Sequence, residues 1–150
     1  MAGLADEVAP GLDGLAQLRA LIASGRKPGI LTALDFDFVE VDAGRAVFAG
    51  VPGERAYNPI GTVHGGYAAT LLDSACGCAV HSRLSPTQGY TTLELKVAYH
   101  KAINKDSGVL RAEGKVLTMG RRAAFAEARL CDAQGRLYAS ATSTLLVFER

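Results

Sequence analysis

The spacing of hydrophobic and polar positions changes along this 150-residue chain. Apolar residues at helical spacing over 11–24 predict a short N-terminal helix, and residues 1–10 are expected to form a loose arm. Alternating apolar and polar residues in 34–41 and 45–51 predict two strands. The intervening segment, 42–44, is a candidate hairpin turn.

The longest helical pattern covers residues 66–83 and consists largely of small residues. Glycine inside a helix costs about 1 kcal/mol relative to alanine, so we infer that other elements approach this helix closely. Four further apolar segments predict strands near 90–102, 109–119, 122–132 and 136–148. Their short connections favour an antiparallel meander.

Six strands and one apolar helix predict an α+β fold. We expect an antiparallel six-stranded curved sheet wrapped around the central helix. Residues 1–29 are assigned to the N-terminal arm and short helix, and residues 30–150 to a single domain. The chain is long enough to bury a sizeable core.

The composition narrows the classes of partner. A formal net charge of +1 does not favour nucleic acid. No apolar run approaches the roughly 20 residues that span a bilayer, and the first residues lack a signal-peptide pattern. The odd number of cysteines, Cys76, Cys78 and Cys131, indicates reduced thiols and neither a disulfide framework nor a metal site. We therefore expect a cytoplasmic protein with no membrane partner.

The candidate chemistry lies at the start of the central helix. The segment 58–66 reads NPIGTVHGG and leads into an apolar helix that contains one carboxylate, Asp73. Unpaired N–H groups at a helix start can hold a developing oxyanion. A carboxylate among apolar residues needs a functional reason. Together these features indicate carbonyl chemistry.

Several motifs carry a family resemblance: Asn58, GTVHGG at 61–66, Asp73, GRRA at 120–123, and GRLYA at 135–139 followed by ATST at 141–144. With these motifs the chain resembles hot-dog-fold acyl-CoA thioesterases of the phenylacetic-acid-degradation (PaaI-like) type over roughly residues 30–148. The resemblance implies hydrolysis of acyl-CoA thioesters without a metal or organic cofactor, CoA being part of the substrate. It also implies a homodimer with joined sheets, usually paired into a homotetramer.

The resemblance also implies roles for individual residues. In the family, an Asn, a His and the following Gly act near the thioester carbonyl, and an acidic helix residue drives water attack. These roles transfer to Asn58, His64, Gly65 and Asp73. Thr92 matches a hydroxyl residue that helps to hold the water in some members, with Thr91 as the neighbouring alternative. Asp73 could act as a general base or attack the carbonyl directly to form an anhydride.

The CoA phosphates favour Arg and Lys as partners, although basic residues in turns are by default solvated. Family resemblance places the nucleotide near two basic segments, and Tyr99 and His100 are expected to flank the pantetheine path. The candidate substrate-binding residues are Gly66, Thr91, Tyr99, His100, Lys101, Gly120, Arg121 and Arg122.

Helix geometry adds a deduction about subunits. Gly65 and Asp73 are eight residues apart, which is roughly 12 Å along one helix. Both groups cannot touch one carbonyl from the same copy of the chain. If both act, Asp73 comes from a neighbouring subunit, and a twofold dimer shares its two sites. We therefore expect the monomer to be inactive.

Two other functions compete with thioester hydrolysis. A hot-dog enoyl-thioester hydratase or dehydratase would need an acid–base pair, for which His64 and Asp73 are the only candidates. A non-catalytic acyl-CoA-binding or sensing module would not need Asp73. His64 and Asn58 also have plain structural interpretations, as a helix brace and a turn residue.

Overall fold

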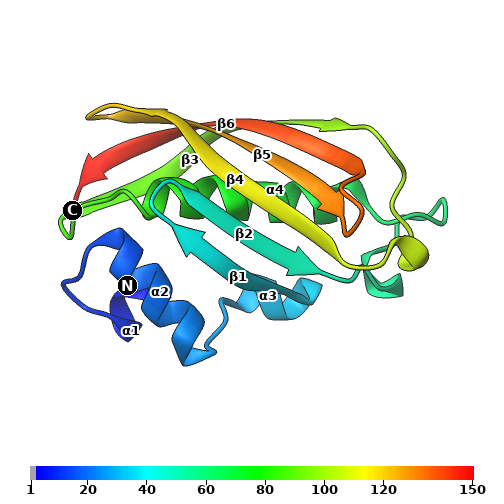
Figure 1. Cartoon of the computed structure of the whole chain (residues 1–150), viewed down its shortest axis with the longest axis horizontal. Helices are drawn as coiled ribbons and strands as arrows, with labels where there is room; N and C mark the ends of the chain where they lie inside the picture. The colour runs from blue at the N-terminus through cyan, green and yellow to red at the C-terminus, as the bar shows by residue number, and fades with distance from the viewer. Residues whose placement is uncertain (1–2) are drawn as a thin grey trace.

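The computed structural model describes residues 3–150 and shows a six-stranded antiparallel sheet wrapped around the long helix α4 (Gly65–His81) (Figure 1). The strand order is β1-β2-β4-β5-β6-β3. The strands are β1 (Phe36–Asp42), β2 (Arg45–Gly50), β3 (Gln88–Tyr99), β4 (Leu110–Met119), β5 (Ala123–Asp132) and β6 (Leu137–Glu149). The predicted α+β class, curved sheet and central helix are confirmed.

Three helices precede the sheet: α1 (Leu4–Val8), α2 (Gly14–Ser24) and α3 (Gly29–Leu34). Two 3-10 turns, η1 (Glu54–Ala56) and η2 (Lys105–Ser107), lie in loops. The loose arm predicted for residues 1–10 is wrong over residues 4–8, while residues 1 and 2 lie outside the described part. A tertiary contact orders this segment, because Gln17 Nε2 donates to Asp6 Oδ1 at 2.9 Å. Helix α3 was not predicted.

The predicted meander is correct for β4, β5 and β6 but wrong for β3. Strand β3 pairs with β6, from Gln88 opposite Glu149 to Tyr99 opposite Ala139. Strand β4 has β2 on one side and β5 on the other, so β3 cannot pair with it and pairs instead with β6 at the edge of the sheet. The connection after β3 therefore crosses one end of the sheet instead of forming a hairpin.

Close packing explains the small residues of α4. Leu71, Leu72 and Ala75 are fully buried against the inner face of the sheet. On β4, a Cβ atom added to Gly114 would overlap with the backbone of Ala75. Glycine therefore lets the strand touch the helix backbone directly, as inferred from the sequence.

The two edges of the sheet differ. Helices α2 and α3 lie beside β1, whereas within residues 3–150 no element covers the outer edge of the 12-residue strand β3 (Figure 1). A bulge lies between Thr92 and Glu94, and Leu93 in this bulge is 62% exposed. An uncovered, long edge strand with an exposed leucine is a ready surface for pairing with another chain.

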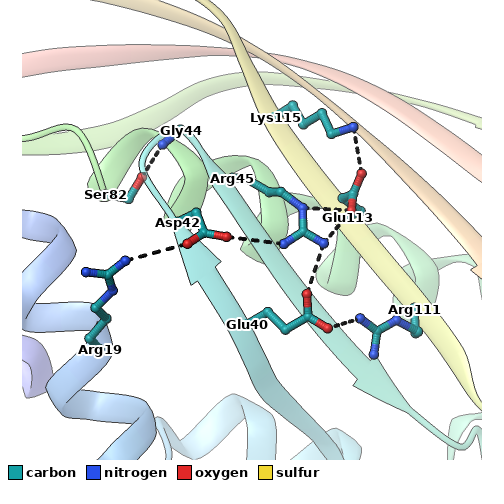
Figure 2. Close-up of polar contacts among 9 residues, drawn as sticks. All are labelled: Arg19, Glu40, Asp42, Gly44, Arg45, Ser82, Arg111, Glu113 and Lys115. Carbon is teal, nitrogen blue, oxygen red and sulfur yellow. Dashed lines mark hydrogen bonds and ion pairs between the residues drawn. The ribbon is translucent and has the colours of Figure 1, made fainter.

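Ion pairs cover the outer face of β1, β2 and β4 (Figure 2). Arg45 bonds to Glu40 at 3.0 Å and to Glu113 at 2.8 Å, and Arg111 also bonds to Glu40. Because the hydrogen-bonded carboxylates favour its charged form, the pKa of Arg45 is raised. The network holds three neighbouring strands together on the side away from α4.

Candidate active site

His64 is the N-cap of α4. Its Nδ1 accepts a hydrogen bond from the Gly66 N–H at 2.8 Å, which satisfies one of the free donors at the helix start. Because Nδ1 is the acceptor, a neutral His64 carries its proton on Nε2. The ring therefore braces the helix start and also presents a donor.

Asn58 organises the loop that leads to His64. Its Oδ1 accepts from the N–H groups of Ile60 and Thr62, each at 3.1 Å, and its Nδ2 donates to Thr62 Oγ1 at 2.8 Å. Gly61 within this loop has φ 86°, a left-handed conformation that glycine adopts at little cost. The side chain of Asn58 thus stabilises the loop, and one hydrogen of its Nδ2 group is not used in these bonds.

Tyr99 of β3 contacts the backbone of Gly65 at the start of α4. The Tyr99 hydroxyl donates to the Gly65 carbonyl oxygen at 2.8 Å, and a Cβ atom on Gly65 would lie 2.9 Å from that hydroxyl. Glycine is needed here because the tyrosine ring lies directly on the backbone. Within residues 3–150 the Gly65 N–H has no hydrogen-bond acceptor, as is normal for the first residue of a helix.

A cleft of about 340 Å³ lies over this helix start. It brings together five of the residues predicted from the sequence: His64, Gly65, Tyr99, His100 and Lys101. His100 lies 2.8 Å from Ser140 Oγ, and the Lys101 ammonium lies 5.2 Å from the centre of the Tyr138 ring. One side of the cleft thus presents the Gly65 N–H and the His64 ring as hydrogen-bond donors, and the other side carries the Lys101 ammonium group.

Asp73 lies two turns further along α4 and is not part of this cleft. Thr92 Oγ1 of β3 donates to Asp73 Oδ1 at 3.0 Å, and the Asp73 side chain is half-buried. Adjacent strand residues point to opposite faces, so Thr91 points away from α4. The structure therefore brings Thr92, and not Thr91, to the carboxylate.

Gly120, Arg121 and Arg122 lie in the β4–β5 turn, away from the His64 cleft. Arg121 and Arg122 line a second hollow of about 350 Å³ together with Gln88, where β3 starts. The His64 cleft lies where β3 ends. A single chain therefore does not bring the two sets of basic residues together.

Other reactive groups are unsuited to nucleophilic attack. Burial raises the pKa of the Cys76 and Cys78 thiols to about 12, so both stay protonated.

Within the described residues, no group of three or more His, Cys, Asp or Glu side chains could hold a metal ion. No helix over the same span is long and apolar enough to cross a membrane.

The thioesterase superfamily model matches residues 60–139, a segment that contains the helix start, Asp73 and Thr92. The chain belongs to the thioesterase superfamily. Its relatives include the 1,4-dihydroxy-2-naphthoyl-CoA hydrolase of Listeria monocytogenes, 24% identical over 119 residues, which are 79% of this chain and 95% of the relative. The putative esterase ComA2 of Bacillus subtilis is 26% identical over 125 residues, 83% of this chain and 98% of that protein.

Among solved structures, the PaaI protein of Escherichia coli, from the phenylacetic acid degradation operon, superposes with a TM-score of 0.78 at 18% identity. The match covers 90% of this chain and 94% of that protein, and it shows a shared fold. The predicted resemblance to PaaI-like hot-dog thioesterases is confirmed. The protein is an enzyme of the thioesterase class with a hot-dog fold.

Proposed function

We propose that this protein hydrolyses acyl-CoA thioesters to the free acid and CoA, at a site that two subunits share. One observation carries the proposal: α4 begins at Gly65, whose N–H has no acceptor within residues 3–150, and the same helix holds Asp73, which accepts a hydrogen bond from Thr92 of β3. The name of the Listeria relative, a CoA-thioester hydrolase, supports CoA esters as the substrate class.

The helix start supplies the electrophilic half of the site. The Gly65 N–H donates to the thioester oxygen, and the positive end of the α4 dipole stabilises the oxyanion that forms there. His64 Nε2–H is the second donor on this side, with its ring fixed by the Gly66 N–H. Asn58 acts indirectly, through the loop that it organises.

Asp73 and Thr92 supply the water-activating half. Thr92 Oγ1 donates its only hydrogen to Asp73 Oδ1. The lone pairs of Oγ1 can therefore accept a hydrogen bond from a water molecule that donates its other hydrogen to the carboxylate. As a general base, Asp73 takes the water proton while the water oxygen attacks the carbonyl carbon. As a nucleophile, Asp73 expels the CoA thiolate, and water then hydrolyses the mixed anhydride.

The two halves meet in a homodimer. Gly65 and Asp73 are about 12 Å apart along α4, too far to act on one carbonyl. Antiparallel pairing of the uncovered β3 edges would place two α4 helices side by side, so that Asp73 of one copy reaches the Gly65 cleft of the other. A homotetramer would be formed from two such dimers, and no cofactor beyond the substrate is required.

The same pairing accounts for the two separated basic regions. In an antiparallel β3 pair, the start of one strand lies beside the end of the other. Arg121 and Arg122 lie near the start of β3, and Lys101 follows its end. We place the CoA phosphates between Lys101 of one subunit and the arginines of its partner, with Tyr99 and His100 along the pantetheine path.

Thiol release from a panel of acyl-CoA esters tests the proposal. The wild-type protein should release CoA, and Asp73→Asn should lower kcat by about 100-fold or more. Glu127→Gln, which makes the same change of charge on the outer face of β5, is the matched control. Full activity of Asp73→Asn would refute the assignment. Binding without thiol release would favour a sensor, and loss of the enoyl absorbance of crotonyl-CoA without thiol release would favour a hydratase.

A further inference from the structure

The backbone of β3 presents every second residue to the open edge of the sheet. The His100 N–H donates to the Tyr138 carbonyl oxygen at 2.8 Å, which marks a hydrogen-bonded pair between β3 and β6. Because such pairs alternate along an antiparallel ladder, Lys96 and Glu94 also turn their backbone groups toward β6. Leu95, between them, therefore directs its N–H and carbonyl groups to the open edge.

Two opposite charges lie on the outer face of this stretch of β3. Glu94 and Lys96 are both exposed, and Thr144 of β6 donates to Glu94 Oε2 at 3.0 Å. The ion pairs formed within residues 3–150 include neither residue, in contrast to the charged side chains over β1, β2 and β4 (Figure 2). Leu95 packs against the core on the other face. The edge thus carries a carboxylate and an ammonium group that flank an apolar residue.

The shared site defines where a twofold axis would cross the chain. If Gly65 of one subunit meets Asp73 of the other, Ala69, midway between them, lies on the axis beside its own copy. On β3, Thr92 bonds to Asp73 and Tyr99 bonds to Gly65. The axis therefore crosses β3 near the middle of the interval between Thr92 and Tyr99.

Backbone direction and charge then select one register. Residues directly opposite in an antiparallel pair turn their backbone groups the same way, either toward or away from the partner strand, so the axis passes through a residue and not between two. An axis at Glu94 or Lys96 would place like charges opposite each other, which is destabilising. An axis at Val97 would place Lys96 opposite Ala98. An axis at Leu95 places Glu94 of each subunit opposite Lys96 of the other.

We propose that two reciprocal ion pairs, each joining Glu94 of one subunit to Lys96 of the other, set the register in which the two β3 strands pair. The inference rests on the proposed function, because the shared site defines the axis. In this register Glu94 and Lys96 form a non-hydrogen-bonded pair, in which the side chains approach most closely. Moving the axis by one residue slides the other subunit by two residues, about 7 Å, and so removes Asp73 from the Gly65 cleft.

Charge reversal tests the ion pairs. Glu94→Lys and Lys96→Glu should each raise the dissociation constant of the homodimer at least about tenfold, because both attractive pairs become repulsive. An equimolar mixture of the two variants restores both pairs in the mixed dimer, so association and thiol release should recover to within about threefold of the wild type. The double variant, Glu94→Lys with Lys96→Glu, should recover in the same way by itself. Sedimentation equilibrium measures association in each case.

Matched control variants lie on β5, two strands from the edge. Glu127→Lys and Arg129→Glu make the same changes of charge, at the same two-residue spacing, on exposed positions of the outer face. Both should keep the wild-type dissociation constant. Weakened association in these controls would show that the net charge of the outer face, and not the Glu94–Lys96 pair, controls pairing.

Disulfide cross-linking tests the register without any measurement of activity. Single cysteines are introduced by Glu94→Cys, Leu95→Cys, Lys96→Cys and Val97→Cys. We expect Leu95→Cys alone to form the intersubunit disulfide, because the two copies of residue 95 would have Cα atoms about 5.5 Å apart. In the other three variants the two introduced thiols are displaced by at least two residues, about 7 Å along the strand. The wild-type protein, with its three native cysteines, gives the background.

Each outcome shows which statement fails. Cross-linking at residue 94, 96 or 97 in place of 95, or a monomeric wild type, would overturn the register. Unchanged association of both charge-reversal variants, or no recovery in their mixture, would overturn the role of the ion pairs. A dimer that cross-links through Leu95→Cys, while the wild type releases no thiol from any acyl-CoA ester, would refute the proposed function and not the register.

Discussion

The Tyr99 hydroxyl donates a hydrogen bond to the Gly65 carbonyl oxygen at 2.8 Å and so ties β3 to the first turn of α4. The helix begins with two glycines, the residues with the greatest backbone freedom. Tyr99 on one side and His64 on the other restrict that freedom. The direction of the Gly65 N–H is therefore set by side chains and not by the glycines themselves.

Tyr99→Phe tests this positioning role. Loss of the hydroxyl should lower kcat about tenfold with little change in KM, because one hydrogen bond of about 1.4 kcal/mol orients the oxyanion donor. Tyr57→Phe is the control, since it removes a hydroxyl that bonds to the Lys105 N–H instead of Gly65. A rise in KM at constant kcat would show that Tyr99 contacts the substrate only.

Thr92 and Thr91 provide an internal comparison for the carboxylate. Thr92→Val removes the donor to Asp73 while conserving shape, and we expect kcat to fall at least about tenfold. Thr91→Val alters the opposite face of β3 and should have a much smaller effect. Steady-state kinetics of both variants on one acyl-CoA ester measure this difference in kcat. Equal losses of kcat would contradict the role of Thr92 beside Asp73.

Much of this fold was predictable because its signals are local. The helical period at 66–83 and the strand alternation depend on near neighbours, and they gave α4 and all six strands within a few residues. The place of β3 beside β6 was missed because it depends on which strand edges remain free in the whole sheet.

The candidate site residues Asn58, His64, Gly65 and Asp73 were predicted from one motif and a family resemblance, and their catalytic roles remain predictions. The bond from Tyr99 to Gly65 was missed because it depends on the register of β3 against α4, and sequence spacing does not give that register.

Gly114→Ala tests the contact between sheet and helix. The added methyl group would overlap with the Ala75 backbone, so we expect a loss of about 3 kcal/mol in the free energy of unfolding. Gly29→Ala is the matched control, because nothing lies within 4 Å of its added Cβ atom. Denaturant unfolding of both variants measures the difference, and equal stabilities would contradict the packing.

His81 makes stability depend on pH. Its pKa is lowered to about 4 by burial, and the nearby Arg150 charge adds to the effect. The unfolded chain, with a His pKa near 6.5, binds more protons between these values, so stability is complete above about pH 6.5 and falls toward pH 4. We expect a loss of about 2 kcal/mol between pH 7 and pH 5.

The variant His81→Gln isolates this effect, because the other titrating groups are the same in both proteins. Unfolding curves from pH 7 to pH 5 should show a smaller decline in His81→Gln than in the wild type. Parallel declines in the two proteins would mean that His81 is already protonated in the folded state.

The most direct test of a shared site is complementation between two inactive variants. Gly65→Ala crowds the Tyr99 hydroxyl at the helix start, and Asp73→Asn removes the carboxylate, so each homodimer should be inactive. When the two are unfolded, mixed in equal amounts and refolded, half of the dimers should be mixed and have one intact site of two, giving about a quarter of wild-type activity. Absence of any recovery, with mixed dimers demonstrably present, would contradict a site formed by Gly65 of one subunit and Asp73 of the other.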